Sequence, residues 1–308
     1  MARRRKGKPI NGWLVIDKPA GPTSNDVVGR VRRLYQAQKV GHGGTLDPMA
    51  TGVLPVALGE ATKTVPYVMD RPKSYRFTVR WGAATSTDDA EGEVIETSPA
   101  RPGEAEIRQA LEAFVGEIEQ VPPVYSAVKI DGARAYDLAR RDQPVELAPR
   151  LVTVTRFALL AVEDSERASF EVDCGKGTYM RALARDLGRA LGCLGHVAAL
   201  RRTAAGGFTE ADAISLDRLE ALGHSPAALE QLLPVESGLD DIPALDLTEM
   251  EASRLRSGQG VSMLARGNRE RALSLEQGGL AYAVSAGRAV AIVRYEAGEL
   301  RPIRVLNL

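Results

Sequence analysis

The chain has few of the residues that build metal sites and disulfide networks. It contains two cysteines, Cys174 and Cys193, without C-x-x-C spacing, and three histidines, no two of which stand four residues apart. Structural zinc sites and disulfide frameworks need closely spaced ligands or paired cysteines. The sequence therefore argues against a metal site and against a disulfide, and we expect both cysteines to be small buried thiols in a reducing compartment.

Long apolar runs are also missing. No segment approaches the roughly 18 apolar residues of a membrane-spanning helix, and no apolar signal-peptide core follows the basic residues 1–8. The content of 44% hydrophobic and 26% charged residues is that of a globular protein, which we expect in the cytoplasm. A length of 308 residues favours one large domain and a smaller one.

The chain has no net charge, because 40 basic and 40 acidic residues cancel. Total charge therefore gives no support to nucleic-acid binding. Basic residues nevertheless cluster at residues 3–8, 30–39, 140–141 and 201–202, whereas acidic residues crowd residues 236–251. If the basic clusters share a face, they can attract phosphates despite the overall neutrality; otherwise they are ordinary solvated surface.

Local patterns predict strands that alternate with helices. Residues 12–17 read as a short buried strand and residues 76–81 as a half-buried one, while apolar spacing predicts helices after Thr23 and between Pro102 and Gly116. No strict β-α-β rhythm is present, which favours a mixed α/β or α+β sheet.

A second transition from strand to helix carries polar residues. Residues 168–174 look extended, residues 175–177 break the strand, and leucines then repeat at helical spacing. The break places Tyr179 and Arg181 near the N-terminus of a helix, a position suited to an anion or a catalytic carboxylate. Beyond about residue 240, short β-type runs at 289–295 and 303–306 predict a separate small β-rich module.

The segment at 41–55, GHGGTLDPMATGVLP, is too rich in glycine for a regular element. Such a loop brings backbone close to a ligand. On residue chemistry alone, Asp47 is first interpreted as a turn residue that hydrogen-bonds its own backbone ahead of Pro48. A lone aspartate in a loop is a weak signal of catalysis.

Eight blocks in a fixed order change that interpretation. They are NG at 11–12 with LVIDKP at 14–19, TSND at 23–26, GHGGTLDPMATGVLPVALGEATK at 41–63, KSY at 73–75, TDDAEG at 87–92, QVPPVYSAVK at 120–129, GKGTYMR at 175–181 and LRR at 200–202. In this order the chain resembles the TruB family of bacterial tRNA pseudouridine synthases. The resemblance implies an α+β fold in which helices flank a mixed, mainly antiparallel sheet. The expected parts are a basic tail at 1–10, a catalytic domain at 11–240 with an RNA-gripping insertion near 124–150, and a PUA-like RNA-binding module at 241–308.

The resemblance also implies roles for matched residues. Asp47 corresponds to the nucleophile, Arg181 to the arginine that pairs with it, and Tyr75 to the tyrosine that stacks on the target base and assists proton removal from C5. The remaining substrate contacts that it implies are His42, which helps to extrude the base, Tyr179 and Leu200. The RNA contacts expected from matched blocks and basic clusters are Asp89, Lys129, Arg140, Arg141, Arg201 and Arg202. For Asp89 the alternative is a loop-positioning contact, and Lys18 and Lys63 are expected to brace the fold or touch phosphate. Gly43 stands where many members have threonine, which predicts a looser loop around His42.

The implied reaction breaks the N1–C1′ bond of uridine and forms a C5–C1′ bond. A carboxylate is ionised at neutral pH without assistance, and a neighbouring guanidinium keeps it so in a dry pocket. Attack at C1′ and addition at C6 both use that carboxylate and stay open, and no redox step calls for a cofactor. The expected activity is isomerisation of uridine 55 in the T-arm of tRNA by a monomer without an obligate protein partner. The alternatives are a non-catalytic RNA-binding or tRNA-folding protein and a synthase directed by a guide RNA.

Overall fold

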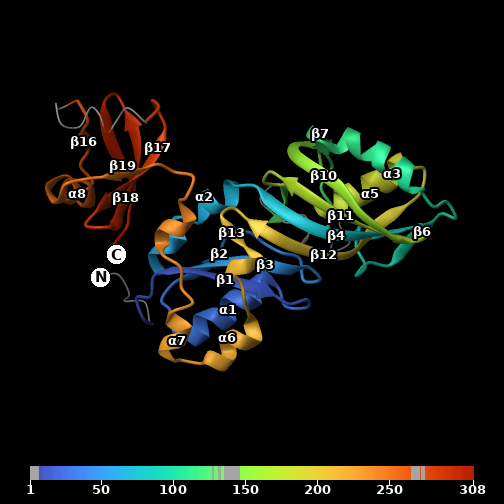
Figure 1. Cartoon of the computed structure of the whole chain (residues 1–308), viewed down its shortest axis with the longest axis horizontal. Helices are drawn as coiled ribbons and strands as arrows, with labels where there is room; N and C mark the ends of the chain where they lie inside the picture. Colours follow the sequence, from blue (N-terminus) through green and yellow to red (C-terminus); the bar gives the residue numbers. More distant parts are fainter. Residues whose placement is uncertain (1–6, 127, 131–132, 135–145, 265–270, 272–274) are drawn as a thin grey trace.

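The computed structural model describes residues 7–126, 128–130, 133–134, 146–264, 271 and 275–308. A ten-stranded sheet runs through the middle of the molecule (Figure 1). In sheet order its strands are β14 (Ile214–Ser215), β1 (Gly12–Lys18), β3 (Thr51–Leu58), β12 (Gly195–Ala205), β4 (Lys73–Trp81), β11 (Arg167–Cys174), β10 (Arg150–Asp164) and β7 (Gly116–Gln120), with β2 (Val40–His42) beside β3 and β13 (Phe208–Thr209) beside β12. Most pairs are antiparallel; β1 with β14 and β3 with β12 are parallel. The expected mixed, mainly antiparallel sheet is confirmed.

Helices pack on one face of this sheet. They are α1 (Ser24–Tyr35), α3 (Glu104–Leu111), α5 (Met180–Ala190), α6 (Leu216–Leu222) and α7 (Pro226–Leu229). Val27 and Val31 of α1 and Leu183 and Leu187 of α5 share one buried core with the sheet. Thr23 caps α1 as predicted, because its hydroxyl accepts a hydrogen bond from the backbone N–H of Asp26.

Strand β1 is buried on both faces, which explains its continuous apolar sequence. Leu14 and Ile16 join the core under the helices, whereas Trp13 and Val15 point to a second core on the other face. Successive side chains of a strand alternate between faces, so a strand covered on both sides needs apolar residues throughout. Two small hairpins, β5 (Ala83–Thr85) with β6 (Val94–Thr97) and β8 (Lys129–Ile130) with β9 (Ala133–Arg134), complete this part.

Beyond residue 243, the described part of the chain forms a five-stranded sheet with its own core. The elements are β15 (Ala244–Asp246), α8 (Glu249–Arg256), β16 (Val261–Ser262), β17 (Leu280–Ser285), β18 (Arg288–Glu296) and β19 (Glu299–Val305). We call this the C-terminal module. The predicted strands at 289–295 and 303–306 are confirmed as β18 and β19. Helix α8 was not predicted, although Thr248 and Glu251 form a capping box, which is a sequence signature of a helix start.

Short elements join the module to the rest of the chain. They are the 3-10 helices η1 (Gly59–Lys63) and η4 (Val235–Gly238) and the helix α2 (Val65–Asp70). The Lys63 ammonium donates to the carbonyl of Val305 at 2.7 Å, and the backbone N–H of Ala289 donates to Glu236 at 2.8 Å. Lys63 thus braces the fold, which is one of the two roles that the sequence left open for it. None of the helices in the described part of the chain is long and apolar enough to cross a membrane.

Candidate active site

Asp47 lies in the loop of residues 43–50 between β2 and β3, here called the Asp47 loop. Its side chain is 35% exposed and forms an ion pair with Arg181. Among the described residues, the carboxylate makes no hydrogen bond to the backbone of its own loop. The interpretation of Asp47 as a self-bonding turn residue therefore does not fit the structure.

The buried ammonium of Lys18 holds one side of the Asp47 loop. It donates to the carbonyls of Pro19 at 2.9 Å, Pro48 at 2.9 Å and Ala50 at 2.7 Å. Burial lowers the pKa of Lys18 to about 8, and the nearby Asp47 carboxylate opposes this decrease. Lys18 thus braces the loop that carries Asp47, the residue that the resemblance identifies as the nucleophile.

Arg202 of β12 holds the other side of the loop. Its guanidinium donates to the carbonyls of Val53 at 2.7 Å, Thr45 at 3.3 Å and Gly44 at 3.1 Å, and the residue is only 1% exposed. Such burial does not fit the direct RNA contact predicted for Arg202. A cation that satisfies two loop carbonyls and one carbonyl of β3 has a structural reason to be buried, and sequence reasoning did not anticipate it.

Gly43 tightens this loop, contrary to the looseness that the sequence predicted. Gly43 is buried, and its N–H donates to the carbonyl of Pro55 at 2.8 Å. A Cβ atom at Gly43 would lie 3.1 Å from Val68 and 3.4 Å from Trp13. The missing side chain therefore allows helix α2, which carries Val68, to pack closely against the loop.

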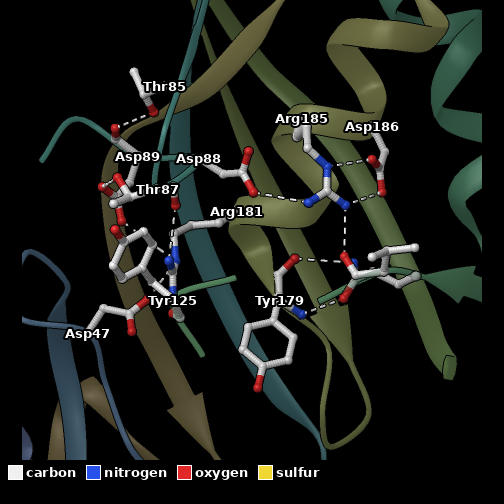
Figure 2. Close-up of polar contacts among 12 residues, drawn as sticks. Asp47, Thr85, Thr87, Asp88, Asp89, Tyr125, Tyr179, Arg181, Arg185 and Asp186 are labelled. Atoms are coloured by element: carbon white, nitrogen blue, oxygen red, sulfur yellow. Dashed lines mark hydrogen bonds and ion pairs between the residues drawn. The ribbon is translucent and has the colours of Figure 1, made fainter. Parts of the chain in front are cut away.

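The Arg181 guanidinium lies between two carboxylates at the start of α5 (Figure 2). Its Nε is 3.0 Å from Oδ2 of Asp47 and 3.6 Å from Oδ2 of Asp89, although neither contact has the alignment of a hydrogen bond. Nη1 donates to the carbonyl of Thr87 at 3.0 Å, and Nη2 to that of Tyr125 at 2.9 Å. The buried cation is thus fixed by two carbonyls, and it places a positive charge beside the Asp47 carboxylate.

Asp89 is 3% exposed, which does not fit the RNA contact predicted for it. Its Oδ1 accepts hydrogen bonds from the Thr87 hydroxyl at 2.5 Å and from the Glu91 backbone N–H at 3.0 Å. The alternative prediction, a loop-positioning contact, agrees with this geometry. Asp89 holds residues 87–91 against Arg181.

Sequence reasoning missed a second cluster around Arg185. Its guanidinium donates to Asp88 at 3.0 Å, to Asp186 at 2.9 and 3.2 Å, and to the carbonyl of Val121 at 2.8 Å. Figure 2 shows this cluster one helical turn beyond Arg181. The i, i+4 spacing on α5 was the available signal, because residues four apart share a helix face.

Both tyrosines of the predicted site lie near Asp47, whose carboxylate contributes to the pKa of each hydroxyl. Tyr75 on β4 faces Arg202 across the strand pair with β12, and Leu200 on β12 is almost fully buried. Burial raises the pKa of the Tyr75 hydroxyl, and the Asp47 carboxylate adds to this increase while Arg202 opposes it. Burial likewise raises the pKa of the Tyr179 hydroxyl. Both rings therefore carry neutral phenols at neutral pH.

His42, the last residue of β2, is also neutral. Burial and the Arg202 charge lower the pKa of His42, and its Nδ1 accepts a hydrogen bond from the Gly44 N–H at 3.3 Å.

Arg201, in contrast to Arg202, keeps a side chain that is 37% exposed and pairs with Asp17 and Glu210. Arg140, Arg141 and the side chain of Lys129 lie outside the described residues. In the described ranges, no group of three or more His, Cys, Asp and Glu residues could hold a metal ion.

Comparison with known proteins agrees with the resemblance. The profile of the TruB family pseudouridylate synthase N-terminal domain matches residues 32–180, and that of the tRNA pseudouridylate synthase B C-terminal domain matches residues 181–240. The tRNA pseudouridine synthase B of Rhodospirillum rubrum is 56% identical over 308 residues and is covered completely, as is this chain. That of Gluconacetobacter diazotrophicus is 54% identical over 99% of this chain and 100% of its own length.

A solved structure shares the fold at lower identity. A chain from an H/ACA ribonucleoprotein bound to a substrate RNA containing 2′-deoxyuridine matches with a TM-score of 0.74 and 23% identity, over 100% of this chain and 92% of that one. The sequence relatives, which are more than 50% identical over the full length, decide the family. The chain belongs to the TruB family of tRNA pseudouridine synthases.

Proposed function

We propose that the chain converts a uridine of tRNA into pseudouridine, at position 55 in the T-arm, with Asp47 as the nucleophile. The observation that carries the proposal is the ion pair of 3.0 Å between Asp47 and the buried Arg181. It occurs in a chain whose full-length relatives are named tRNA pseudouridine synthase B. A protein that only binds RNA has no evident need for a half-exposed carboxylate beside a buried guanidinium.

Each side chain of the site has a task in this reaction. Asp47 attacks either C1′ or C6 and forms a transient O–C bond, while the N1–C1′ bond breaks and the uracil turns. A C5–C1′ bond then forms and the bond to Asp47 breaks, which frees the carboxylate; C5 loses a proton and N1 gains one. Arg181 places its positive charge 3.0 Å from the Asp47 carboxylate. Tyr75 is a neutral phenol, which suits stacking on the extruded base better than direct removal of a proton. Tyr179 and Leu200 line the pocket, and the neutral His42 helps to extrude the base.

The wider proposal concerns where and on what the chain acts. We assign it to the cytoplasm as a monomer that binds the T-arm without a guide RNA or an obligate protein partner. Residues near 124–150 would grip the RNA, and the C-terminal module would act as a PUA-like RNA-binding domain. Because uridine and pseudouridine are isomers, the reaction needs no redox cofactor.

The test is incubation of the purified chain with an unmodified tRNA transcript, followed by pseudouridine mapping. We expect product at position 55 with the parent chain and none with Asp47→Asn, although that variant still binds the transcript. Asp70→Asn, which removes a carboxylate exposed at the surface, is the matched control and keeps its activity. Product formation by Asp47→Asn contradicts the mechanism. A parent chain that binds and never reacts supports the RNA-folding alternative.

A further inference from the structure

Helix α2 connects the Asp47 loop with the C-terminal module. Val68 of α2 packs against Gly43, at the start of the loop. Just before α2, Lys63 donates to the carbonyl of Val305 and Glu60 accepts from the backbone N–H of Asn307. In Figure 1, α2 lies between the large sheet and the strands of the module. A ligand that reaches over α2 from the loop therefore meets the module.

The strands β18 and β19 place three arginines on one face of the module sheet. Arg294 lies directly opposite Arg301, and Arg304 lies opposite Ile292. Paired residues of neighbouring strands point to the same side, as do residues two apart in one strand. Arg294, Arg301 and Arg304 therefore share a face with Tyr282, which is paired with Ile292 on the next strand. Tyr282 packs against the second core, so this face adjoins the catalytic domain.

The charges of this face are only partly compensated. The side chain of Arg294 is 49% exposed and reaches Glu296 only at 3.7 Å, while Arg301 has two nearby glutamates. Within the described ranges, Arg304 is exposed and has no ion-pair partner, and its one hydrogen bond goes to the neighbouring carbonyl of Ile303. Tyr67 of α2 lies close by, since Arg304 and Arg294 both counteract the rise in its pKa that burial causes.

We propose that Tyr67, Arg294 and Arg304 form a binding site for the phosphate backbone of RNA, at the junction between α2 and the C-terminal module. Two exposed guanidinium groups beside a half-buried aromatic ring are the combination that binds phosphates and packs against a sugar or base. The site rests on the proposed function, because it assumes an RNA substrate seated at the Asp47 loop. The site contacts the part of the RNA that lies beyond the hairpin with the target uridine.

The test uses the full chain carrying Asp47→Asn, so that binding is measured without turnover. Binding of full-length tRNA transcript is followed by fluorescence anisotropy at several salt concentrations, for this parent and for the added pair Arg294→Ala and Arg304→Ala. We expect about tenfold weaker binding and a salt slope reduced by about two, because two phosphate contacts are lost. An isolated hairpin with the target uridine is expected to bind both proteins equally.

The pair Arg254→Ala and Arg288→Ala removes the same charge from other exposed positions of the module and is the matched control. Unchanged affinity and salt slope in the Arg294 and Arg304 pair overturn the site, as does an equal loss in the control pair, which indicates a general charge effect. Tyr67→Ala is expected to weaken binding further and Tyr67→Phe to preserve it. Failure of the proposed function has a different signature, because the chain with Asp47 intact then forms no pseudouridine even when tRNA binds.

Discussion

Two arginines one turn apart on α5 each lie between two aspartates, yet the two clusters differ. Every guanidinium nitrogen of Arg185 donates a hydrogen bond, and both of its carboxylate partners are mostly buried. Arg181 donates through two nitrogens only, and its Nε faces Asp47, whose side chain is 35% exposed. The Arg185 cluster is closed, whereas the Arg181 cluster keeps a charged carboxylate accessible.

This difference separates a structural ion-pair network from a reactive one. In the closed cluster all three guanidinium nitrogens of Arg185 donate hydrogen bonds within the protein, which is the arrangement of a structural network. In the open cluster the cation is fixed by the carbonyls of Thr87 and Tyr125 and not by Asp47. Asp47 can therefore move toward a substrate without releasing Arg181. We expect substitutions in the open cluster to affect catalysis and those in the closed cluster to affect stability.

The largest difference is expected between Arg181→Lys and Arg185→Lys. Lysine keeps the charge but not the planar fork, so at Arg181 it cannot hold both carbonyls and face Asp47 at once. We expect single-turnover pseudouridine formation to fall about 10²–10³-fold in Arg181→Lys, and about threefold or less in Arg185→Lys. Equal losses in the two variants contradict the division into open and closed clusters. Thermal unfolding of both variants shows whether either loss reflects unfolding.

A second prediction concerns the support behind Asp47. Arg202→Ala removes the donors to two loop carbonyls and to the carbonyl of Val53 in β3, and a displaced nucleophile reacts slowly even when its substrate binds. We expect kcat to fall about 30- to 100-fold with a smaller change in the KM for tRNA. Arg201→Ala, at the neighbouring exposed position, is expected to change KM more than kcat. A loss in Arg202→Ala that appears in KM alone favours the RNA contact that the sequence predicted.

The sequence predicted the larger elements because their patterns are local. The apolar spacing after Thr23 and the run at Trp13 to Ile16 correspond directly to α1 and β1. Helix α8 was not predicted, because its acidic first residues resemble a linker and only the capping box of Thr248 and Glu251 marks its start. Local sequence patterns thus predict an element where its buried residues recur at a regular period. They miss an element whose start is marked only by a helix cap.

The site was predicted from ordered blocks and not from spacing. The pairing of Asp47 with Arg181, 134 positions apart in the chain (181 minus 47), followed from resemblance. The burial of Arg202 and Asp89 did not, because a charged residue in a sequence does not reveal whether carbonyls or water surround it. Arg202 and Arg201 are neighbours with opposite environments, because successive residues of β12 point to opposite faces of the sheet.

The dependence of activity on pH above neutrality offers a third test of the open cluster. The pKa of Lys18 is about 8 in the folded chain, against an ordinary value of 10.5. A neutral amine donates two hydrogen bonds in place of three, and Asp47 loses a neighbouring positive charge. We expect activity to be about tenfold lower at pH 9 than at pH 7. The free energy of unfolding, in contrast to the activity, increases between about pH 8 and 10.5. In this range the unfolded chain binds a proton at Lys18 that the folded chain has lost.

The reaction rates of Lys18→Arg and Lys73→Arg, measured between pH 6 and 9.5, show whether Lys18 causes the decline in activity at alkaline pH. Arginine stays charged, so the decline above pH 8 is expected to disappear in Lys18→Arg. Burial also lowers the pKa of Lys73 to about 8, but its ammonium caps α2 through the carbonyls of Met69 and Arg71. Lys73→Arg is therefore expected to keep the decline. An unchanged decline in Lys18→Arg excludes Lys18 as its source.

The smallest effect is expected in the closed cluster, for Asp88→Asn. Burial raises the pKa of Asp88 despite the neighbouring Arg185, so its negative charge is costly in the folded state at neutral pH. The asparagine oxygen still accepts the bond from Arg185, and asparagine tolerates the left-handed backbone at this position, where φ is +60°. We expect the free energy of unfolding to change by about 1 kcal/mol or less and the rate to stay within about twofold, as measured by urea unfolding and single-turnover kinetics. Asp89→Asn, one residue later, changes a carboxylate that faces Arg181, and a rate loss of about tenfold is expected there. If Asp88→Asn slows the reaction as much as Asp89→Asn does, the two clusters act as one network across the turn of α5.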